Sequence, residues 1–202
     1  MLGYIYTMPP TKTDEEIIVL YKNNEREALK IIIDRYTSPL YNFAARLTNR
    51  NDARDIVQEV FIKTWKNIGR FNSQKASFKT WIFTITKNTI TDFLRKKRNL
   101  LFSDMETNKD ENINSFAENI EAEDLLPDEA LQKLEDSRFL NKTLEKLSKD
   151  YQEVLILHYQ EEMTFEEIGK ILDKPLNTIK SQHRRALLEL RKIISVSHQN
   201  NF

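Results

Sequence analysis

The chain of 202 residues contains no cysteine, three glycines and three histidines. Without cysteine there is no disulfide, thiol nucleophile, iron–sulfur cluster or cysteine-based zinc site. Three glycines leave no room for the glycine-rich loops that hold phosphate in nucleotide-binding α/β enzymes. No run of about 18 apolar residues occurs, so the sequence predicts no membrane-spanning helix. These absences favour a reducing compartment, and we expect the protein to be cytoplasmic.

Charged residues are abundant, and they are segregated along the chain. The 31 basic and 31 acidic residues give a formal net charge of zero. Residues 25–98 nevertheless carry a net charge of +9, and residues 99–139 carry −9. A basic block of this size indicates an anionic partner, and the acidic block indicates a spacer or a mimic of that anion. A solvated linker between ordinary charged helices would give the same pattern.

Apolar residues recur at the spacing of helix faces, and no stretch alternates as a half-buried strand does. We expect two helical pieces within 26–47, because Pro39 places a break near Thr37–Ser38. The next helix should begin at a cap formed by Asn51 or Asp52. That helix is predicted over 51–65. The later helices are predicted over 75–97, 128–147, 150–161, 164–172 and 176–194. The fold class is therefore predicted to be all-α.

The chain should form two small helical domains joined by an acidic flexible linker. The linker is rich in Asn and Ser and loses the helical period, which is typical of disorder. The segment before Met8 matches no pattern and would be either a disordered extension or the result of an alternative start. The predicted parts are an extension at 1–12, a first domain at 13–98, the linker at 99–127, a second domain at 128–194 and a tail at 195–202.

Two carboxylates in the first domain share an exposed helix face. Asp55 and Glu59 are four residues apart, so they are neighbours on a helix surface. A metal site would need a Glu-x-x-His pair on a facing helix, and the three histidines lie far away in the sequence. Acid–base catalysis lacks a nearby nucleophile or phosphate loop. A docking patch for a basic partner and a plain solvated face both remain open.

The following helix is basic and aromatic, a combination that suits single-stranded nucleic acid. Its polar side chains recur at helical spacing and should form one surface. Phe78, Trp81 and Phe93 lie on the apolar face and are expected in the core, so Phe71 and Phe83 are the better candidates for base contacts. The polar surface consists of Thr84, Lys87, Asn88, Thr91 and Arg95.

Residues 164–190 have the pattern of a helix-turn-helix. Thr164 with Glu167 forms a capping box, Asp173-Lys174-Pro175 ends the first helix, and Asn177 can cap the second. The second helix points Ile179, Ala186, Leu187 and Leu190 inward. Its outward side chains can read base edges or neutralise phosphates. A plain helical hairpin with a solvated basic face is the alternative. The outward set is Thr178, Lys180, Ser181, Gln182, Arg184 and Arg185.

On these residues the chain resembles the extracytoplasmic-function (ECF) sigma factors of bacterial RNA polymerase, which are small two-domain members of the sigma-70 family. Two stretches carry the resemblance. The first is DARDIVQEVFIKTW with ASFKTWIFTITKNTITDFLRKKR, residues 52–65 and 76–98. The second is YQEVLILHYQEEMTFEEIGKILDKPLNTIKSQHRRALLELRK, residues 151–192. Both stretches occur in the family's order and are separated by an acidic linker.

The resemblance implies a transcription initiation factor that binds core RNA polymerase and recognises and melts promoter DNA. The residues that we expect to dock on the polymerase are Asp52, Asp55, Gln58, Glu59 and Phe61. For the minus-ten element they are Phe71, Phe83, Lys87, Asn88, Thr91, Arg95 and Arg98. For the minus-thirty-five element they are the outward set of the second helix, Thr178, Lys180, Ser181, Gln182, Arg184 and Arg185.

The resemblance also implies an anti-sigma factor as a partner, often membrane-embedded in this family, and a linker that threads through the polymerase. We expect no catalytic residue, bound metal or cofactor. The chain departs from the family at Asn177, where Gly is common, at Gln182, where Arg is common, and at His183, where an aliphatic residue is usual. Gln favours adenine where Arg favours guanine. We expect His183 to be partly buried and hydrogen-bonded rather than a pH sensor.

Two other functions fit parts of the sequence. A stand-alone helix-turn-helix regulator would bind duplex DNA without polymerase, but such proteins are usually dimers and no dimerisation helix is evident. A helical adaptor without nucleic acid would leave both basic faces solvated, and its weak DNA binding would not depend on salt.

Overall fold

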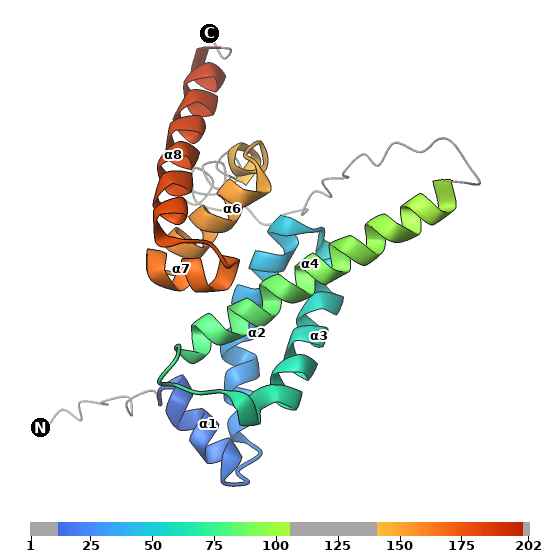
Figure 1. Cartoon of the computed structure of the whole chain (residues 1–202), viewed down its shortest axis with the longest axis vertical. Helices are drawn as coiled ribbons and strands as arrows, with labels where there is room; N and C mark the ends of the chain where they lie inside the picture. The colour runs from blue at the N-terminus through green and yellow to red at the C-terminus, as the bar shows by residue number, and fades with distance from the viewer. Residues whose placement is uncertain (1–11, 106–140, 200–202) are drawn as a thin grey trace, which may run out of the picture.

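The computed structural model describes residues 12–105 and 141–199, which form helices and no strand (Figure 1). The all-α fold class is confirmed for this part of the chain. Residues 1–11 of the predicted extension, residues 106–127 of the predicted linker and the last residues of the tail lie outside these ranges. Within them, no helix combines the length and apolar character needed to cross a bilayer.

Five helical elements form the first domain. They are α1 (Asp14–Lys22), α2 (Ala28–Leu47), α3 (Arg50–Asn67), the short 3₁₀ helix η1 (Ile68–Arg70) and α4 (Phe78–Met105). Helices α2, α3 and α4 pack on one another, and α1 packs mainly on α2. Phe43, Phe78 and Phe83 are fully buried at their centre. This aromatic core fixes the position of α4, the basic helix.

Helix α2 is continuous, so the predicted break near Thr37–Ser38 is wrong. Pro39 costs the helix one backbone hydrogen bond and about 3 kcal/mol. The buried face of α2 offsets that cost, because Tyr36 is 4% exposed and Leu40 is fully buried on either side of Pro39. Thr37 Oγ1 also donates to the Ile33 carbonyl oxygen at 2.6 Å. Tertiary packing therefore outweighs the local preference of proline.

The predicted N-terminal caps of α3 and of α8 (Leu176–Gln199) are wrong. The cap of α3 is Asn49, whose side chain accepts the backbone N–H of Asp52 at 2.9 Å. Helix α8 begins at Leu176, and the Pro175 carbonyl accepts the N–H groups of Thr178 and Ile179, so Asn177 is not the cap. Helix α4 (Phe78–Met105) continues past residue 98, although the linker was predicted to begin at residue 99. Residues 99–105 include no Gly or Pro that would end the helix.

The second domain contains α6 (Lys149–Leu155), the π-helical turn η2 (Ile156–Gln160), α7 (Phe165–Leu172) and α8 (Leu176–Gln199). The capping box of Thr164 and Glu167 is confirmed at the start of α7. Helix α7 ends where Asp173 adopts a left-handed conformation with φ 52°. Gly169 suits this tight turn, because a Cβ there would lie 2.9 Å from the Lys174 carbonyl oxygen. Helices α7 and α8 thus form the predicted helix-turn-helix.

The two domains pack against each other in this structure. Helix α7 lies alongside α4, and α6 packs against α2 (Figure 1). Buried apolar residues from both domains, among them Phe83, Leu157 and Met163, belong to one continuous cluster. A smaller cluster of Leu144, Leu155 and Ala186 joins α6 to α8. The first domain therefore presents α3 and part of α4 to solvent, while the second presents α8.

Candidate nucleic-acid interface

The exposed face of α3 carries the residues predicted to dock on the polymerase. Asp55 and Gln58 are exposed, and Asp55 has no ion pair among the described residues. Asp52 pairs with Lys97 of α4 at 2.9 Å, and Glu59 pairs with Lys63 on its own helix at 2.8 Å. Within the ranges that the structure describes, no three His, Asp or Glu side chains come together as metal ligands would.

Phe61 completes this predicted set at the edge of the same face. Its ring is partly buried and stacks on Trp65, with centroids 6.1 Å apart and planes 15° apart. The face thus combines one free carboxylate, one amide and an aromatic edge on a single helix. Such a surface suits a protein partner with basic and apolar groups.

The polar stripe of α4 is confirmed as one surface, although its members differ in accessibility. Asn88, Thr91 and Arg98 are exposed. The Arg95 side chain is 64% exposed and pairs with Asp92 at 2.9 Å. Lys87 is different, because its ammonium is paired with Glu153 of the second domain. The C-terminal half of the stripe is thus free to bind a ligand, and the N-terminal half is occupied.

Phe83 is not an accessible base contact, so this prediction is wrong. Its side chain is fully buried and lies 5.6 Å from Phe43, measured between ring centroids. Helix α4 packs on α2 and α3 from one side and on α7 from another, so it buries a wider arc than an ordinary surface helix. Phe71 keeps part of its ring exposed, but it packs edge-on against Phe78 with centroids 5.5 Å apart.

The core predictions for this helix hold for Phe78, which is fully buried, and in part for Trp81 and Phe93, which pack against the core while remaining partly exposed. On α8, Ile179 and Ala186 are buried as predicted and Leu190 is partly buried. Leu187 is 38% exposed and does not point fully inward. The buried faces of α4 and α8 thus largely follow the helical periodicity of the sequence.

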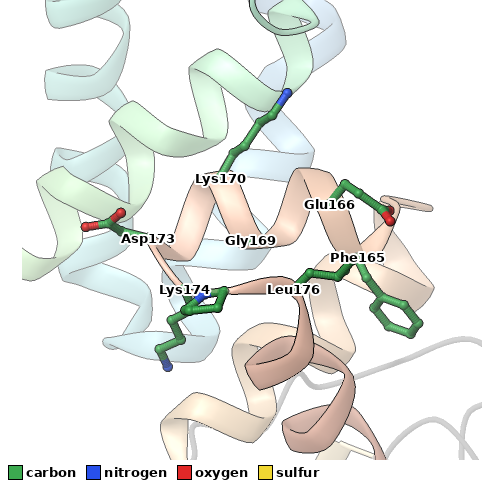
Figure 2. Close-up of a pocket in the computed structure, with 8 residues that line it drawn as sticks. Phe165, Glu166, Gly169, Lys170, Asp173, Lys174 and Leu176 are labelled. Atoms are coloured by element: carbon green, nitrogen blue, oxygen red, sulfur yellow. The ribbon is translucent and has the colours of Figure 1, made fainter.

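The helix-turn-helix presents most of its predicted DNA-binding set to solvent. Lys180, Ser181, Arg184 and Arg185 are exposed on α8. Gln182 turns toward α6 instead, where its Nε2 donates to Asp150 Oδ2 at 3.4 Å and its Oε1 is buried. Figure 2 shows the turn between α7 and α8, with Lys170 and Lys174 pointing to opposite sides of a surface pocket. The Lys174 ammonium forms an ion pair with the Asp150 carboxylate at 3.3 Å and so links the turn to α6.

His183 is a partly buried residue of α8 and lies in a cluster of rings with His158, Tyr159 and Phe165. Its Nε2 is 3.1 Å from the Tyr159 hydroxyl, and its ring lies 5.1 Å from that of His158. His158 in turn bonds the Met163 carbonyl oxygen through Nδ1 at 2.9 Å. Burial and the neighbouring His158 lower the pKa of His183 below its ordinary value of 6.5. The predicted partly buried and hydrogen-bonded histidine is therefore confirmed.

The lowered pKa of His183 predicts a stability effect in mild acid. Below about pH 6.5 the unfolded chain takes up a proton that the folded chain resists, so the free energy of unfolding should fall as the pH decreases. His183→Leu removes this term and should make the melting temperature less dependent on pH between about 7.5 and 5.5. Thermal unfolding of both proteins at several pH values measures the effect, and equal slopes would contradict it.

Three residues that join the domains, Lys79, Glu153 and Glu161, are not among the site residues predicted from the sequence. Lys79 of α4 pairs with Glu161 at 3.2 Å, and Glu153 holds Lys87. Glu153 adjoins the apolar run VLIL, which indicates that it is near the core. The sequence has no signal for the identity of its cationic partner, because 66 residues separate Lys87 from Glu153.

Two family models match the chain in the order of these two domains. Sigma-70 region 2 matches residues 32–100, which include α3 and most of α4, and sigma-70 region 4 matches residues 140–190, which include α6 and α7. The chain belongs to the sigma-70 family. Together the matches cover more than half of its length.

Curated relatives place it among the ECF sigma factors. The ECF RNA polymerase sigma factor SigW of Bacillus subtilis is 34% identical over 172 residues, which are 85% of this chain and 91% of that protein. The ECF RNA polymerase sigma-E factor of Escherichia coli K12 is 28% identical over 178 residues, 86% of this chain and 90% of that protein. As an ECF sigma factor, the chain is a transcription initiation factor, and a stand-alone regulator is not favoured.

Solved structures show the same fold. The sigma factor RpoE of Bartonella quintana, in complex with the anti-sigma factor NepR, has a TM-score of 0.65 and 27% identity, covering 83% of this chain and 97% of that one. CnrH, in complex with the cytosolic domain of CnrY, has a TM-score of 0.63 and 19% identity, covering 92% and 99%. The second similarity concerns the fold alone.

Proposed function

We propose that this sigma factor uses three separate surfaces to start transcription. The α3 face binds core RNA polymerase, the α4 stripe binds the minus-ten element, and the outward face of α8 binds the minus-thirty-five element. The observation that carries the proposal is the exposure of three polar helix faces within the matched regions 2 and 4. We assign the corresponding domains to residues 13–98 and 128–194, with the acidic linker between them.

The α3 surface is the site for a basic partner. Asp55 and Gln58 are exposed there, and Asp52 and Glu59 add carboxylates whose cations come from this chain itself. Carboxylates without buried partners attract a cationic protein surface and set its orientation. We assign this face to the polymerase rather than to DNA because Asp55, its carboxylate without an ion pair among the described residues, repels phosphate.

The α4 stripe supplies groups for a separated DNA strand. Asn88 and Thr91 can hydrogen-bond base edges, and the guanidinium groups of Arg95 and Arg98 can bind phosphates or stack on bases. Unstacking costs a few kcal/mol per base, and binding of the displaced bases offsets this cost without a fuel molecule. The proposed role therefore needs no catalytic residue, metal or cofactor.

The α8 face reads duplex DNA upstream. Arg185 is exposed among Lys180, Ser181 and Arg184, on the helix that follows the turn at Asp173. Arginine can bond guanine through two atoms in the major groove, while lysine neutralises phosphate. Gln182 is a weaker candidate, since its amide faces Asp150.

Arg185→Ala should weaken binding to the promoter's minus-thirty-five duplex by about 1–3 kcal/mol and relax specificity at one position. Arg191→Ala, an exposed arginine further along α8, is the matched control and should have a smaller effect. Fluorescence anisotropy compares the promoter duplex selected by the holoenzyme with a scrambled one. An equal loss on both duplexes would reduce Arg185 to a phosphate contact.

We further propose that an anti-sigma factor controls the chain in the cytoplasm. The Bartonella quintana relative bound to NepR supports a partner of this kind. The cysteine-free composition supports the compartment. Co-purification from membrane and soluble fractions tests whether that partner is membrane-embedded.

Co-elution with sigma-free core RNA polymerase on size exclusion tests the proposed function as a whole. A one-to-one complex that starts transcription from a defined promoter is the expected result. If the purified, folded chain elutes alone and still binds duplex DNA, the stand-alone regulator becomes the better interpretation. If DNA binding is weak and does not depend on salt, a helical adaptor that does not act on nucleic acid becomes the better interpretation.

A further inference from the structure

One carboxylate of α6 binds two side chains of the helix-turn-helix. Asp150 lies in the first turn of α6. Its Oδ2 accepts from Gln182 Nε2 of α8 at 3.4 Å and pairs with Lys174 Nζ of the α7–α8 turn at 3.3 Å. Helix α6 packs against α8 (Figure 1). Asp150 therefore connects α6 both to the turn and to the helix that we propose for duplex recognition.

Gln182 follows the buried side of α8 rather than its outward side. Ile179 and Ala186 are fully buried, and Gln182 lies three residues after one and four residues before the other. At about 100° per residue, Gln182 is about 60° around the helix from Ile179, whereas exposed Ser181 is about 160° away. The helical period thus places Gln182 at the edge of the face that packs on α6.

The Gln182 amide has one polar contact and one unpaired atom. Its nitrogen faces Asp150 because an amide nitrogen donates and a carboxylate accepts. Its Oε1 is buried and has no hydrogen-bond partner among the described residues. A buried carbonyl oxygen without a partner loses its hydration uncompensated, which favours outward rotation of the side chain. The hydrogen bond to Asp150 opposes that rotation.

Outward rotation would change what α8 can read. A glutamine amide in the major groove can bond adenine through N6 and N7. In the observed position the Gln182 nitrogen is bonded to Asp150 and its oxygen is buried, so neither atom is available to a base. Ser181 and Arg185 stay exposed on the outward side. The contact with Asp150 therefore withdraws one side chain from the base-reading set of α8.

We propose that Asp150 is a specificity-determining residue of the minus-thirty-five site, because it keeps Gln182 on the α6 side of α8 and leaves one base pair unread. This inference rests on the proposed function of α8 and deepens it. Asp150 acts through Gln182, so it is a positioning residue and does not contact DNA. The outward residues, Arg185 among them, then specify the duplex, and the base pair next to Gln182 tolerates any base.

Base preference, rather than affinity alone, tests this role. The probe is an upstream duplex that the holoenzyme of this chain and core polymerase selects from random sequence, together with every single base-pair substitution of it. Competition in fluorescence anisotropy gives the relative affinity of the holoenzyme for each duplex. A purely structural role of Asp150 would change affinity equally for all duplexes, whereas a specificity role changes the preference at one base pair.

Removing the carboxylate should release the glutamine. Asp150→Ala should create a preference of about fivefold for adenine at one base pair that the wild type does not discriminate, the lower end of the range for a bidentate contact. Gln182→Ala should keep every base preference within about twofold of the wild type, whatever its overall affinity. The double variant should lack the new adenine preference, because the amide is gone.

Two matched variants separate the two contacts of Asp150. Asp150→Asn keeps an oxygen that can accept from Gln182 and removes the charge that pairs with Lys174. Lys174→Gln removes the same ion pair from the other side. Both should keep the wild-type base preferences. A new adenine preference in Lys174→Gln would assign the effect to the ion pair and overturn the proposal.

The Asp150 side chain is 59% exposed, so Asp150→Ala should fold, which circular dichroism checks. A folded Asp150→Ala protein with unchanged base preferences would overturn the proposal. Loss of a base preference in Gln182→Ala would do so as well, because Gln182 would then read DNA in the wild type. The prediction for Gln182→Ala does not depend on the folding of Asp150→Ala.

Arg185→Ala separates this inference from the proposed function. If Arg185→Ala loses a preference at one base pair while Asp150→Ala changes none, α8 reads DNA but Asp150 does not determine its specificity. If Arg185→Ala changes no preference at any base pair, α8 is not the reader of the duplex. The proposed function then fails at this helix, and the inference fails with it.

Discussion

Replacing Phe83 with alanine should destabilise the protein by about 3–5 kcal/mol, the cost of removing a fully buried phenylalanine. The side chain is 0% exposed and packs on Phe43 at the centre of the first domain. Its removal leaves a cavity among α2, α4 and the neighbouring aromatic residues, which a close-packed core refills only in part. Chemical denaturation of the wild type and the variant measures the difference.

Phe93→Ala is the matched control for this experiment. Phe93 lies on the same helix and is only partly buried, so its truncation should cost less. Oligonucleotide binding provides the contrasting readout. If Phe83→Ala retained full stability but lost affinity for single-stranded DNA, Phe83 would be a base contact and its buried position in the core would not describe the active state.

Reversing the charge of Asp55 should weaken binding to core RNA polymerase by at least about tenfold. Asp55 is the carboxylate on the α3 face that has no ion pair among the described residues, so its charge is available to a partner. Asp55→Lys places a cation opposite the basic surface that we propose for the polymerase. The exposed position makes a large loss of folding stability unexpected.

The control for this variant is Asp34→Lys, which makes the same change of charge at an exposed position on α2. Size-exclusion co-elution and a direct affinity measurement with core enzyme compare the two. Equal affinity of Asp55→Lys and the wild type would remove the α3 face from the proposed docking surface. An equal loss in both variants would indicate a general effect of net charge rather than a contact at Asp55.

Sequence alone located α3, α4, α7 and α8, their order and the position of the helix-turn-helix. Apolar spacing located α3 and the inner face of α8, and the Thr164–Glu167 capping box located the start of α7. These features depend on residues within one or two turns of each other, so local pattern was sufficient. The exposure of Asp55, Arg95 and Arg185 also followed from helical period.

Tertiary structure decided which residues on these helices are accessible. Phe83 is buried because α4 is covered from more than one side, and α2 continues through Pro39 because its packed face outweighs the proline. Lys87 is occupied because Glu153, 66 residues later, meets it across the domain interface. Periodicity describes one helix at a time, whereas burial and ion pairing depend on how distant helices pack. For that reason the sequence determined the family and the recognition helices, and the fold alone determined that one domain covers part of the other's proposed DNA surface.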